Sequence, residues 1–348
     1  MDMLREQIDS RMVWKGADFA SKADITLAFT PEQLDEIDGL VARLRAAGLG
    51  LDAVERKHVE LPLTAPLLAE MREELKSGTG LVLLRGLDAL RHSKEDMELI
   101  FWAFGTLLGQ SVSQSVMGDR LGHVSDMTRT DPHARAYRNR DELTPHTDTS
   151  DIVGLCCLRA AKSGGVSIVT SVTAVHNEML RSYPEYLEVL YRGFRYHRRG
   201  EQPPGADPIT PHRVPVFSYR GGQLSCRYIR SHIEAAAREL GEPLTSLERA
   251  ALDTLERLTL ELALRFTMEP GEIYFINNYT TLHARTGFED FEQEDRRRHM
   301  LRLWLYAPDW RELDPELELY PDAEGRGGIA PQPGKTPSYA GWKQAAAE

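Results

Sequence analysis

The sequence has few cysteines, no long apolar run and no excess of positive charge, and each absence excludes a class of protein. Its three cysteines, Cys156, Cys157 and Cys226, fit neither a disulfide framework nor the ligand spacing of a zinc site. No stretch of about 18 apolar residues could cross a membrane, and the N-terminus lacks the apolar core of a signal peptide. We therefore expect a cytoplasmic protein with no membrane partner.

Charge and motif content exclude two further classes. The formal net charge is −11, so no overall positive field would attract nucleic acid, and we expect no nucleic-acid partner. The fingerprint G-x-G-x-x-G does not follow any predicted strand, which argues against a Rossmann fold. The chain has 348 residues, of which 41% are hydrophobic, and this is enough for a large core.

Helix signals dominate the first third of the chain and return near residue 246. Thr30 and Gln33 form a capping box in front of an amphipathic stretch that stops at Gly48. Ser93 caps another amphipathic stretch. A further long helix is predicted over residues 246–268.

From residue 150 onward, short apolar segments bounded by turn residues predict β-strands. They cover residues 152–160, 165–171, 214–229 (as a hairpin that turns at Gly221 and Gly222), 271–278 and 298–307. These strands lie far apart in the sequence and show no β–α–β rhythm. We therefore expect a mainly β protein with α insertions, built as an antiparallel sandwich or barrel.

An imidazole and a carboxylate stand two residues apart where the first of these strands begins. In an extended backbone, His146 and Asp148 would face one point, with Thr147 turned away. This geometry suits two ligands of one metal ion, although such a triplet also occurs in plain surface turns. His283, which follows another predicted strand, would complete the facial triad of non-haem Fe(II) oxygenases. Its plain alternative is a loop or capping residue.

The last predicted strand carries two arginines on one face. Alternation places four side chains together on that face: Arg298, Met300, Arg302 and Trp304. His299 would point to the opposite face, away from the site. Buried arginines need anions, so Arg298 and Arg302 either form structural salt bridges or bind carboxylates of small molecules.

Four motifs, HTD, GGVS, LHART and RRRHMLRLW, follow one another in the order of the taurine dioxygenase family, and residues 80–308 resemble that family. The resemblance implies a double-stranded β-helix (jelly roll) that uses Fe(II), 2-oxoglutarate and O2. It also implies roles for six residues: iron ligands His146, Asp148 and His283, 2-oxoglutarate contacts Arg298 and Ser167, and a substrate-anion contact Arg302. Family halogenases have a small residue in place of the carboxylate ligand, so the presence of Asp148 favours an oxygenase.

The same resemblance implies a core at residues 80–310 with a helical insertion at about 231–268. We expect residues 1–79 to pack on this core as a helical segment and residues 311–348 to form a tail. These two segments either cover the pocket or join copies of the chain into a homo-oligomer. Residues 111–144 and 198–213 are expected to form the rim, with Tyr137, Arg138 and Arg213 as substrate contacts.

The reaction that the resemblance implies is hydroxylation of an unactivated C–H bond in a small acidic or amino-acid-like metabolite, as in natural-product biosynthesis, with release of succinate and CO2. Desaturation or cleavage of a carbon–heteroatom bond is the alternative outcome of the same chemistry. Two other classes stay open at this point. A non-catalytic jelly roll that binds small acids has no use for three metal ligands, and a metal-dependent hydrolase leaves Arg298 without a task.

Overall fold

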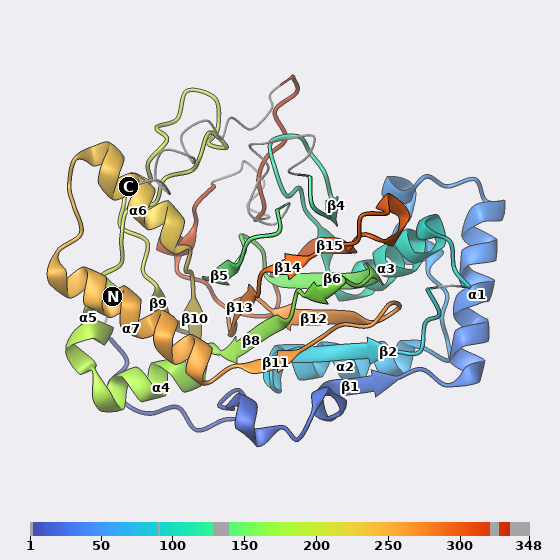
Figure 1. Ribbon diagram of the computed structural model, residues 1–348, viewed down its shortest axis with the longest axis horizontal. Helices are drawn as coiled ribbons and strands as arrows, with labels where there is room; N and C mark the ends of the chain where they lie inside the picture. Colours follow the sequence, from blue (N-terminus) through green and yellow to red (C-terminus); the bar gives the residue numbers. More distant parts are fainter. Residues whose placement is uncertain (1–2, 90, 128–138, 321–326, 335–348) are drawn as a thin grey trace.

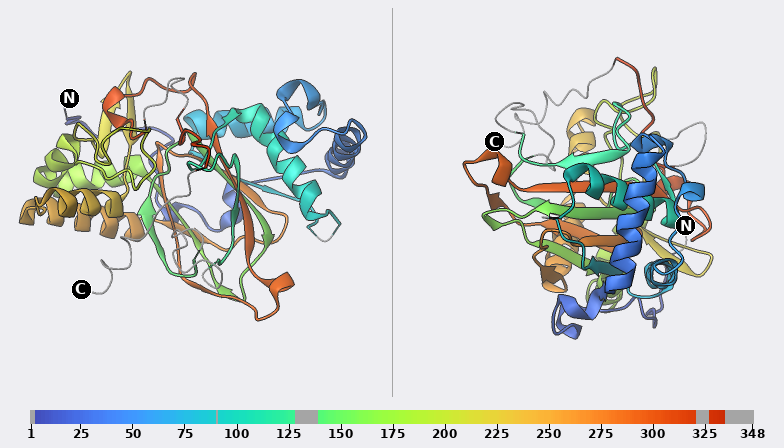
Figure 2. Two further views of the ribbon diagram at one scale, coloured as in Figure 1. Left: turned by 90° about the horizontal axis from the view of Figure 1, so that it is seen from above. Right: turned by 90° about the vertical axis from the view of Figure 1, so that its right-hand side faces the viewer.

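The computed structural model describes residues 3–89, 91–127, 139–320 and 327–334. Two residues predicted to contact substrate, Tyr137 and Arg138, lie outside the described residues. Two β-sheets face each other at the centre, and helices pack on the outside at either end (Figures 1 and 2). The N-terminal helices lie beside one sheet, and the later helices lie beyond the other sheet.

The larger sheet contains seven strands in the order β1-β2-β12-β6-β15-β3, with β4 also paired to β15. Their bounds are β1 (Thr26–Ala28), β2 (Leu81–Arg85), β3 (Gln110–Ser111), β4 (Leu121–Val124), β6 (Ile152–Arg159), β12 (Ile273–Asn277) and β15 (His299–Tyr306). β1 and β2 run parallel, and the other pairs are antiparallel. The N-terminal segment therefore adds a strand to this sheet in addition to its helices.

The smaller sheet has the order β11-β8-β13-β5, and two further pairs of strands form separate two-stranded sheets. Its strands are β5 (Leu143–His146), β8 (Ser167–Ser171), β11 (Leu264–Phe266) and β13 (Thr281–Arg285). The further pairs are β7 (Ser163–Gly164) with β14 (Phe288–Glu289), and β9 (Phe217–Arg220) with β10 (Gln223–Cys226). Gly221 and Gly222 form the predicted turn between β9 and β10, both with positive φ. Two facing antiparallel sheets with helices outside confirm the predicted jelly roll.

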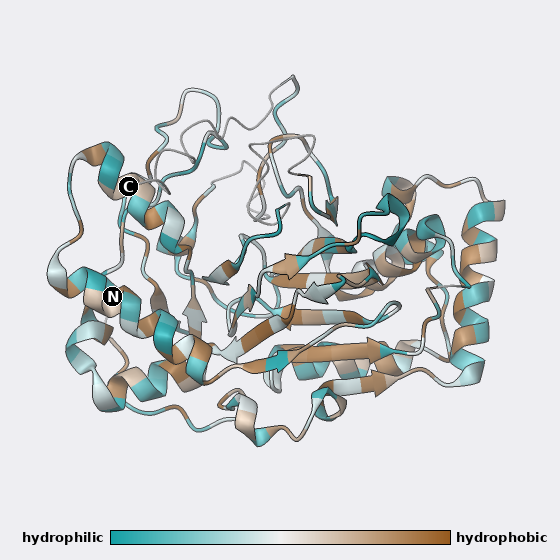
Figure 3. Ribbon diagram, in the orientation of Figure 1, coloured by the Kyte–Doolittle hydropathy of each residue, from teal (hydrophilic) through white to brown (hydrophobic). Residues whose placement is uncertain are grey.

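Three helices cover the outer face of the larger sheet: α1 (Pro31–Ala46), α2 (Ala65–Ser77) and α3 (Lys94–Leu108). The capping box that begins α1 and the Ser93 cap that begins α3 are formed as predicted. Leu301, Leu303 and Leu305 of β15 pack with Phe101 and Phe104 of α3 in one apolar cluster. Figure 3 shows mostly hydrophobic strands at the centre and helices in which hydrophobic and hydrophilic residues alternate. The opposite face of β15 consequently turns toward the space between the sheets.

Four helices lie beyond the smaller sheet: α4 (Val172–Ser182), α5 (Pro184–Arg192), α6 (Arg230–Leu240) and α7 (Ser246–Glu261). The prediction that α7 reaches residue 268 is wrong, because Leu264–Phe266 forms β11 and pairs with β8. Along Leu264–Phe266 the side chains are buried, exposed and buried, which is the alternation of a strand. Burial of the two apolar side chains and backbone hydrogen bonds at the edge of the sheet favour the strand over a longer helix. None of the helices in the described ranges is long and apolar enough to cross a membrane.

The described part of the C-terminal tail lies against the loops at one end of the sandwich. The backbone N–H of Gly328 donates to the carbonyl of Thr149, 2.7 Å away, and that of Ile329 donates to the carbonyl of Ser113. Leu317 and Leu319 are buried. The tail therefore contacts the residue that directly follows Asp148, so its position is coupled to the proposed metal-binding loop.

Helix α4 holds a fully buried histidine, from which we predict an acid-sensitive fold. Burial lowers the pKa of His176 to about 4, and its Nε2 lies 2.9 Å from the Tyr191 hydroxyl. Below pH 6.5 the histidine is protonated in the unfolded chain, whereas in the folded chain it stays neutral until the pH falls to about 4. The contribution to stability is thus complete above pH 6.5 and is lost as the pH falls toward 4.

Replacing His176 with glutamine should make stability less dependent on pH. Between pH 7 and pH 5, the wild-type free energy of unfolding should fall by about 1–2 kcal/mol more than that of the variant. Urea denaturation at both pH values measures this difference. An equal decrease in the free energy of unfolding between pH 7 and pH 5 for the two proteins would show that His176 is not the acid-sensitive group.

Candidate iron site

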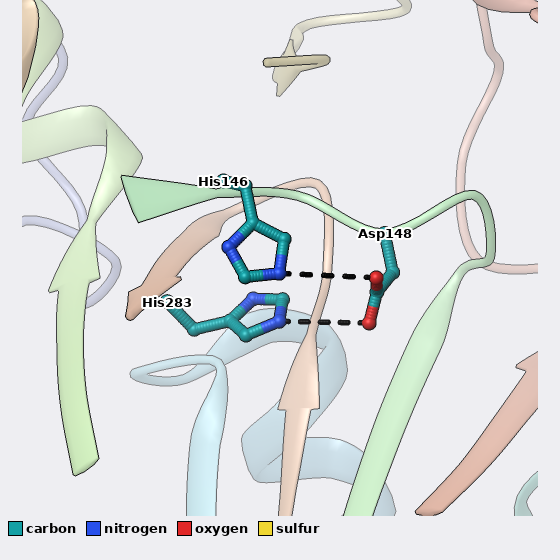
Figure 4. Close-up of side chains that lie close together, drawn as sticks. All are labelled: His146, Asp148 and His283. Atoms are coloured by element: carbon teal, nitrogen blue, oxygen red, sulfur yellow. Dashed lines mark ion pairs between the residues drawn. The ribbon is translucent and has the colours of Figure 1, made fainter. Parts of the chain in front are cut away.

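The structure brings His146, Asp148 and His283 together between the two sheets. One ligand atom from each residue lies within 4.8 Å of the other two. Nε2 of His146 is 3.9 Å from Oδ1 of Asp148, and Nε2 of His283 is 3.5 Å from Oδ2 (Figure 4). Two imidazole nitrogens and a carboxylate therefore converge on one point.

Strand pairing explains why residues so distant in sequence meet. His146 ends β5 and His283 lies in β13, and the two are direct partners in the antiparallel register. Their ring centres are consequently only 4.2 Å apart. His146 Nδ1 lies 2.8 Å from the carbonyl of Thr144, which leaves its Nε2 without a proton and directed at the shared point.

Electrostatics prepare two of the three side chains, those of His146 and Asp148, for a cation. Burial, followed by repulsion from His283, lowers the pKa of His146 to about 4, so this imidazole is neutral at pH 7. Burial would raise the pKa of Asp148, but Arg302 and the two histidines outweigh it and hold that pKa well below its usual range. A neutral imidazole and an ionised carboxylate are the forms that bind a divalent metal ion. The donor set therefore fits the Fe(II) that the sequence resemblance implies.

The backbone around Asp148 is held by a buried amide. Asn278 follows β12, and its Oδ1 accepts from the backbone N–H of Asp148 at 2.9 Å. Its Nδ2 donates to the carbonyls of Asp148 (2.7 Å) and Ser150 (2.6 Å). Thr147 is turned away as predicted and bonds to the backbone of Tyr228. The sequence places Asn278 at the end of a predicted strand but does not reveal that its amide holds the backbone of Asp148.

Arg298 lies just before β15, with its side chain buried. Among the described residues, its Nη1 has no hydrogen-bond partner, and its guanidinium forms no ion pair. Its Cζ is 5.1 Å from the ring centre of Phe288. Ser167 of β8 is also buried. Burial raises the pKa of the Tyr274 hydroxyl, and the charge of Arg298 and hydrogen bonding with Ser167 act in the opposite direction. A buried cation without an anion is unfavourable, so this guanidinium suits an incoming carboxylate.

A second buried arginine, Arg285, was not anticipated from the sequence. It lies two residues after His283, and its Cζ is 4.8 Å from the same Phe288 ring. Burial, followed by the charge of Arg298, lowers the pKa of Arg285 to about 10. Its Nη2 donates to the carbonyls of Asn139 and Asp141. Arg285 therefore ties the segment before His146 to β13 and adds positive charge beside Arg298.

Arg302 points toward the triad from β15. Its Nη1 lies 3.8 Å from Oδ2 of Asp148, and its Nε donates to Oε1 of Gln114 at 2.8 Å. Gln114 in turn donates to the backbone carbonyl of Arg302 at 2.8 Å. Arg302 thus already has protein partners, and its place beside Asp148 is fixed by Gln114.

Arg213, predicted to contact substrate, is engaged between two helices. Its Nε donates to the carbonyl of Gly193 at the end of α5, and its Nη2 binds Glu248 in the first turn of α7, both at 2.8 Å. These contacts give Arg213 a structural role, and its role toward a substrate stays a prediction. His299 lies on the opposite face of β15, as predicted, with its Nε2 2.9 Å from Nδ1 of His123.

A double-stranded β-helix that gathers two histidines and an aspartate belongs to the class of non-haem Fe(II) oxygenases. Residues 45–304 match the family described as "Taurine catabolism dioxygenase TauD, TfdA family", and the chain belongs to this family. It is therefore an Fe(II)- and 2-oxoglutarate-dependent dioxygenase, as the resemblance of its motifs implied.

Two curated relatives align along most of the chain. The "FR-33289 synthase" of Streptomyces rubellomurinus is 31% identical over 328 residues, which cover 92% of this chain and 96% of that protein. The "Taurine hydroxylase-like protein SAT17" of Stachybotrys chartarum is 26% identical over 318 residues, covering 86% of this chain and 80% of the relative.

Solved structures of two oxygenases share the fold. Asparagine oxygenase, solved with Fe(II), 3-hydroxyasparagine and succinate, aligns with a TM-score of 0.64 at 18% identity over 81% of this chain and 93% of its own. The non-haem iron oxygenase OrfP, solved with Fe and α-ketoglutaric acid, aligns with a TM-score of 0.60 at 15% identity, covering 80% and 93%.

Proposed function

We propose that this enzyme hydroxylates an unactivated C–H bond of a small acidic or amino-acid-like metabolite. The observation that carries the proposal is the pairing of the His146–Asp148–His283 group with a buried Arg298 that forms no ion pair in the described part of the chain. The first group suits Fe(II), and the second suits the far carboxylate of 2-oxoglutarate. A hydrolase or a simple acid-binding protein would use only one of the two.

Each side chain has a separate task in this proposal. His146, Asp148 and His283 hold Fe(II) on one face, while Arg298 and Ser167 orient 2-oxoglutarate. When bound, Fe(II) and 2-oxoglutarate supply oxygen activation and C–H hydroxylation, with succinate and CO2 as products. The protein contributes position and the exclusion of water, which the burial of Asp148, His283 and Arg298 supports.

An amino-acid-like substrate is supported by the structural neighbours, whose solved complexes contain 3-hydroxyasparagine and hydroxylated L-arginine. The relative named FR-33289 synthase supports a role in making a natural product. Arg302 supplies the charge for an acidic group of the substrate, and the free, buried cysteines agree with a cytoplasmic setting.

An anaerobic titration tests the proposal. Fe(II) and then 2-oxoglutarate are added to the apo-protein, while the visible charge-transfer absorption of the chelate is followed. We expect a saturable band at one equivalent of each. Succinate release is then screened with amino acids and small acids, and a product heavier by one oxygen atom identifies hydroxylation. Tight zinc binding without any band would instead favour the hydrolase.

Replacing Arg302 with alanine should weaken binding of the organic substrate more than binding of 2-oxoglutarate. A hydrogen bond to a charged group contributes about 1.5–3 kcal/mol, so the KM for the substrate should rise about tenfold or more. The KM for 2-oxoglutarate should change much less, because Arg298 is intact. Steady-state succinate release with each component varied separately measures both values. The reverse pattern would mean that the two arginines have exchanged roles.

A further inference from the structure

The two oxygens of Asp148 lie in different surroundings. Oδ2 accepts a hydrogen bond from the indole N–H of Trp304 at 2.9 Å, and Nη1 of Arg302 lies 3.8 Å from the same oxygen. Oδ1 faces Nε2 of His146 at 3.9 Å. Nε2 of His283 is 3.5 Å from Oδ2, so each oxygen faces one of the two histidine ligands, and the donors of β15 gather at Oδ2.

Trp304 is placed for this contact by the alternation of β15. It shares the inward face with Arg302, and its side chain is almost fully buried at 4% exposure. A buried indole N–H usually has an acceptor, and a carboxylate is a stronger acceptor than a neutral group. The bond therefore holds both the ring and the carboxylate in one orientation.

The backbone of Asp148 is already fixed, which leaves rotation of its side chain as the remaining freedom. Asn278 bonds to both the N–H and the carbonyl of Asp148. Rotation about the side-chain bonds would still exchange Oδ1 and Oδ2 or present both to a metal ion. The Trp304 bond opposes that rotation.

We infer that Trp304 is a positioning residue that holds the Asp148 carboxylate in the orientation in which Oδ1 faces His146 and Oδ2 faces His283. This inference rests on the proposed function, since it assumes that Asp148 binds Fe(II). Its consequence is a carboxylate that is already oriented toward the metal position before Fe(II) binds, which strengthens Fe(II) binding. Donation to Oδ2 also makes the carboxylate a weaker electron donor.

The test compares Trp304→Phe with Trp310→Phe as a matched control. Trp310 is equally buried at 4% exposure, but its indole N–H has no hydrogen-bond partner among the described residues. Both changes remove the same atoms from the core, and only Trp304→Phe removes a bond to Asp148. As apo-proteins, both variants should lose the packing of the larger ring, and Trp304→Phe should lose more thermal stability because only this variant also loses a hydrogen bond.

We expect Fe(II) to bind about tenfold more weakly to Trp304→Phe, because loss of a group that orients a metal ligand typically costs 10–100-fold in affinity. Trp310→Phe should match the wild type. The charge-transfer band of the 2-oxoglutarate complex should also move to longer wavelength in Trp304→Phe alone, since the freed carboxylate donates more charge. Anaerobic calorimetry and absorption spectroscopy measure the two effects.

Identical affinity and band position in the two variants would overturn the role of Trp304. Absence of Fe(II) binding in the wild type would overturn the proposed function itself, so the two failures are distinguishable. If Trp304→Phe does not fold, 3-benzothienylalanine placed at position 304 keeps the shape of the ring and removes only the N–H. The same weaker Fe(II) binding is expected for that protein.

Discussion

Replacing His283 with alanine should abolish both the charge-transfer band and succinate release. His283 supplies one of three ligand atoms, and its partner His146 is held by strand register rather than by a flexible loop. The same register fixes the His283 imidazole beside His146, so the site is built around this ligand. Loss of a residue that merely orients a ligand costs about 10–100-fold in metal affinity, so loss of the ligand itself should cost more than that.

The matched control is His299→Ala. His299 lies on the face of β15 that points away from the triad, where it contacts His123. This variant should keep the wild-type band and affinity for Fe(II), as measured by the same anaerobic titration. A band that survives in His283→Ala but disappears in His299→Ala would mean that the faces of the sheet are wrongly assigned. Asp148→Ala should behave like His283→Ala.

Most of the correct predictions about the site came from the alternation of side chains along strands. The period of two along β15 placed Met300 and Trp304 on one face, and both lie in the cluster between the sheets, whereas the alternating Leu301, Leu303 and Leu305 lie in the cluster with the helices. The same rule placed His146 and Asp148 on one side with Thr147 turned away. These predictions depend only on local backbone geometry, which a sequence pattern reports directly.

Features that depend on contacts between distant segments could not be predicted in this way. Trp304 and Asp148 are 156 residues apart in sequence, and alternation shows the face of the indole but not its acceptor. Arg213 has the charge expected of a substrate contact, yet Glu248 from a separate helix already binds it. The three residues of β11 look helical until β8 offers backbone partners. In each case the deciding partner is chosen by the tertiary fold.

Replacing Arg298 with glutamine should raise the concentration of 2-oxoglutarate needed for half-saturation by about 30-fold or more, with little change in Fe(II) affinity. Removing one partner of a buried charge pair costs about 2–5 kcal/mol, and most of that penalty is the other charge left unpaired. Arg297→Gln is the control, because Arg297 bonds to the carbonyls of Phe291 and Glu292 instead. The titration with 2-oxoglutarate at fixed Fe(II) measures the change, and an unchanged requirement would assign Arg298 to structure.

The same variant should show a second effect in the opposite direction. Arg298 is a buried cation with no ion pair in the described ranges, and burial lowers its pKa, so it destabilises the protein until an anion binds. Without ligands, Arg298→Gln should therefore unfold at the same temperature as the wild type or a higher one. Addition of metal and 2-oxoglutarate should stabilise the wild type strongly and the variant little, because a ligand stabilises the state that binds it. A variant that is less stable without ligands, yet responds normally to 2-oxoglutarate, would show that Arg298 holds the fold and not the cosubstrate.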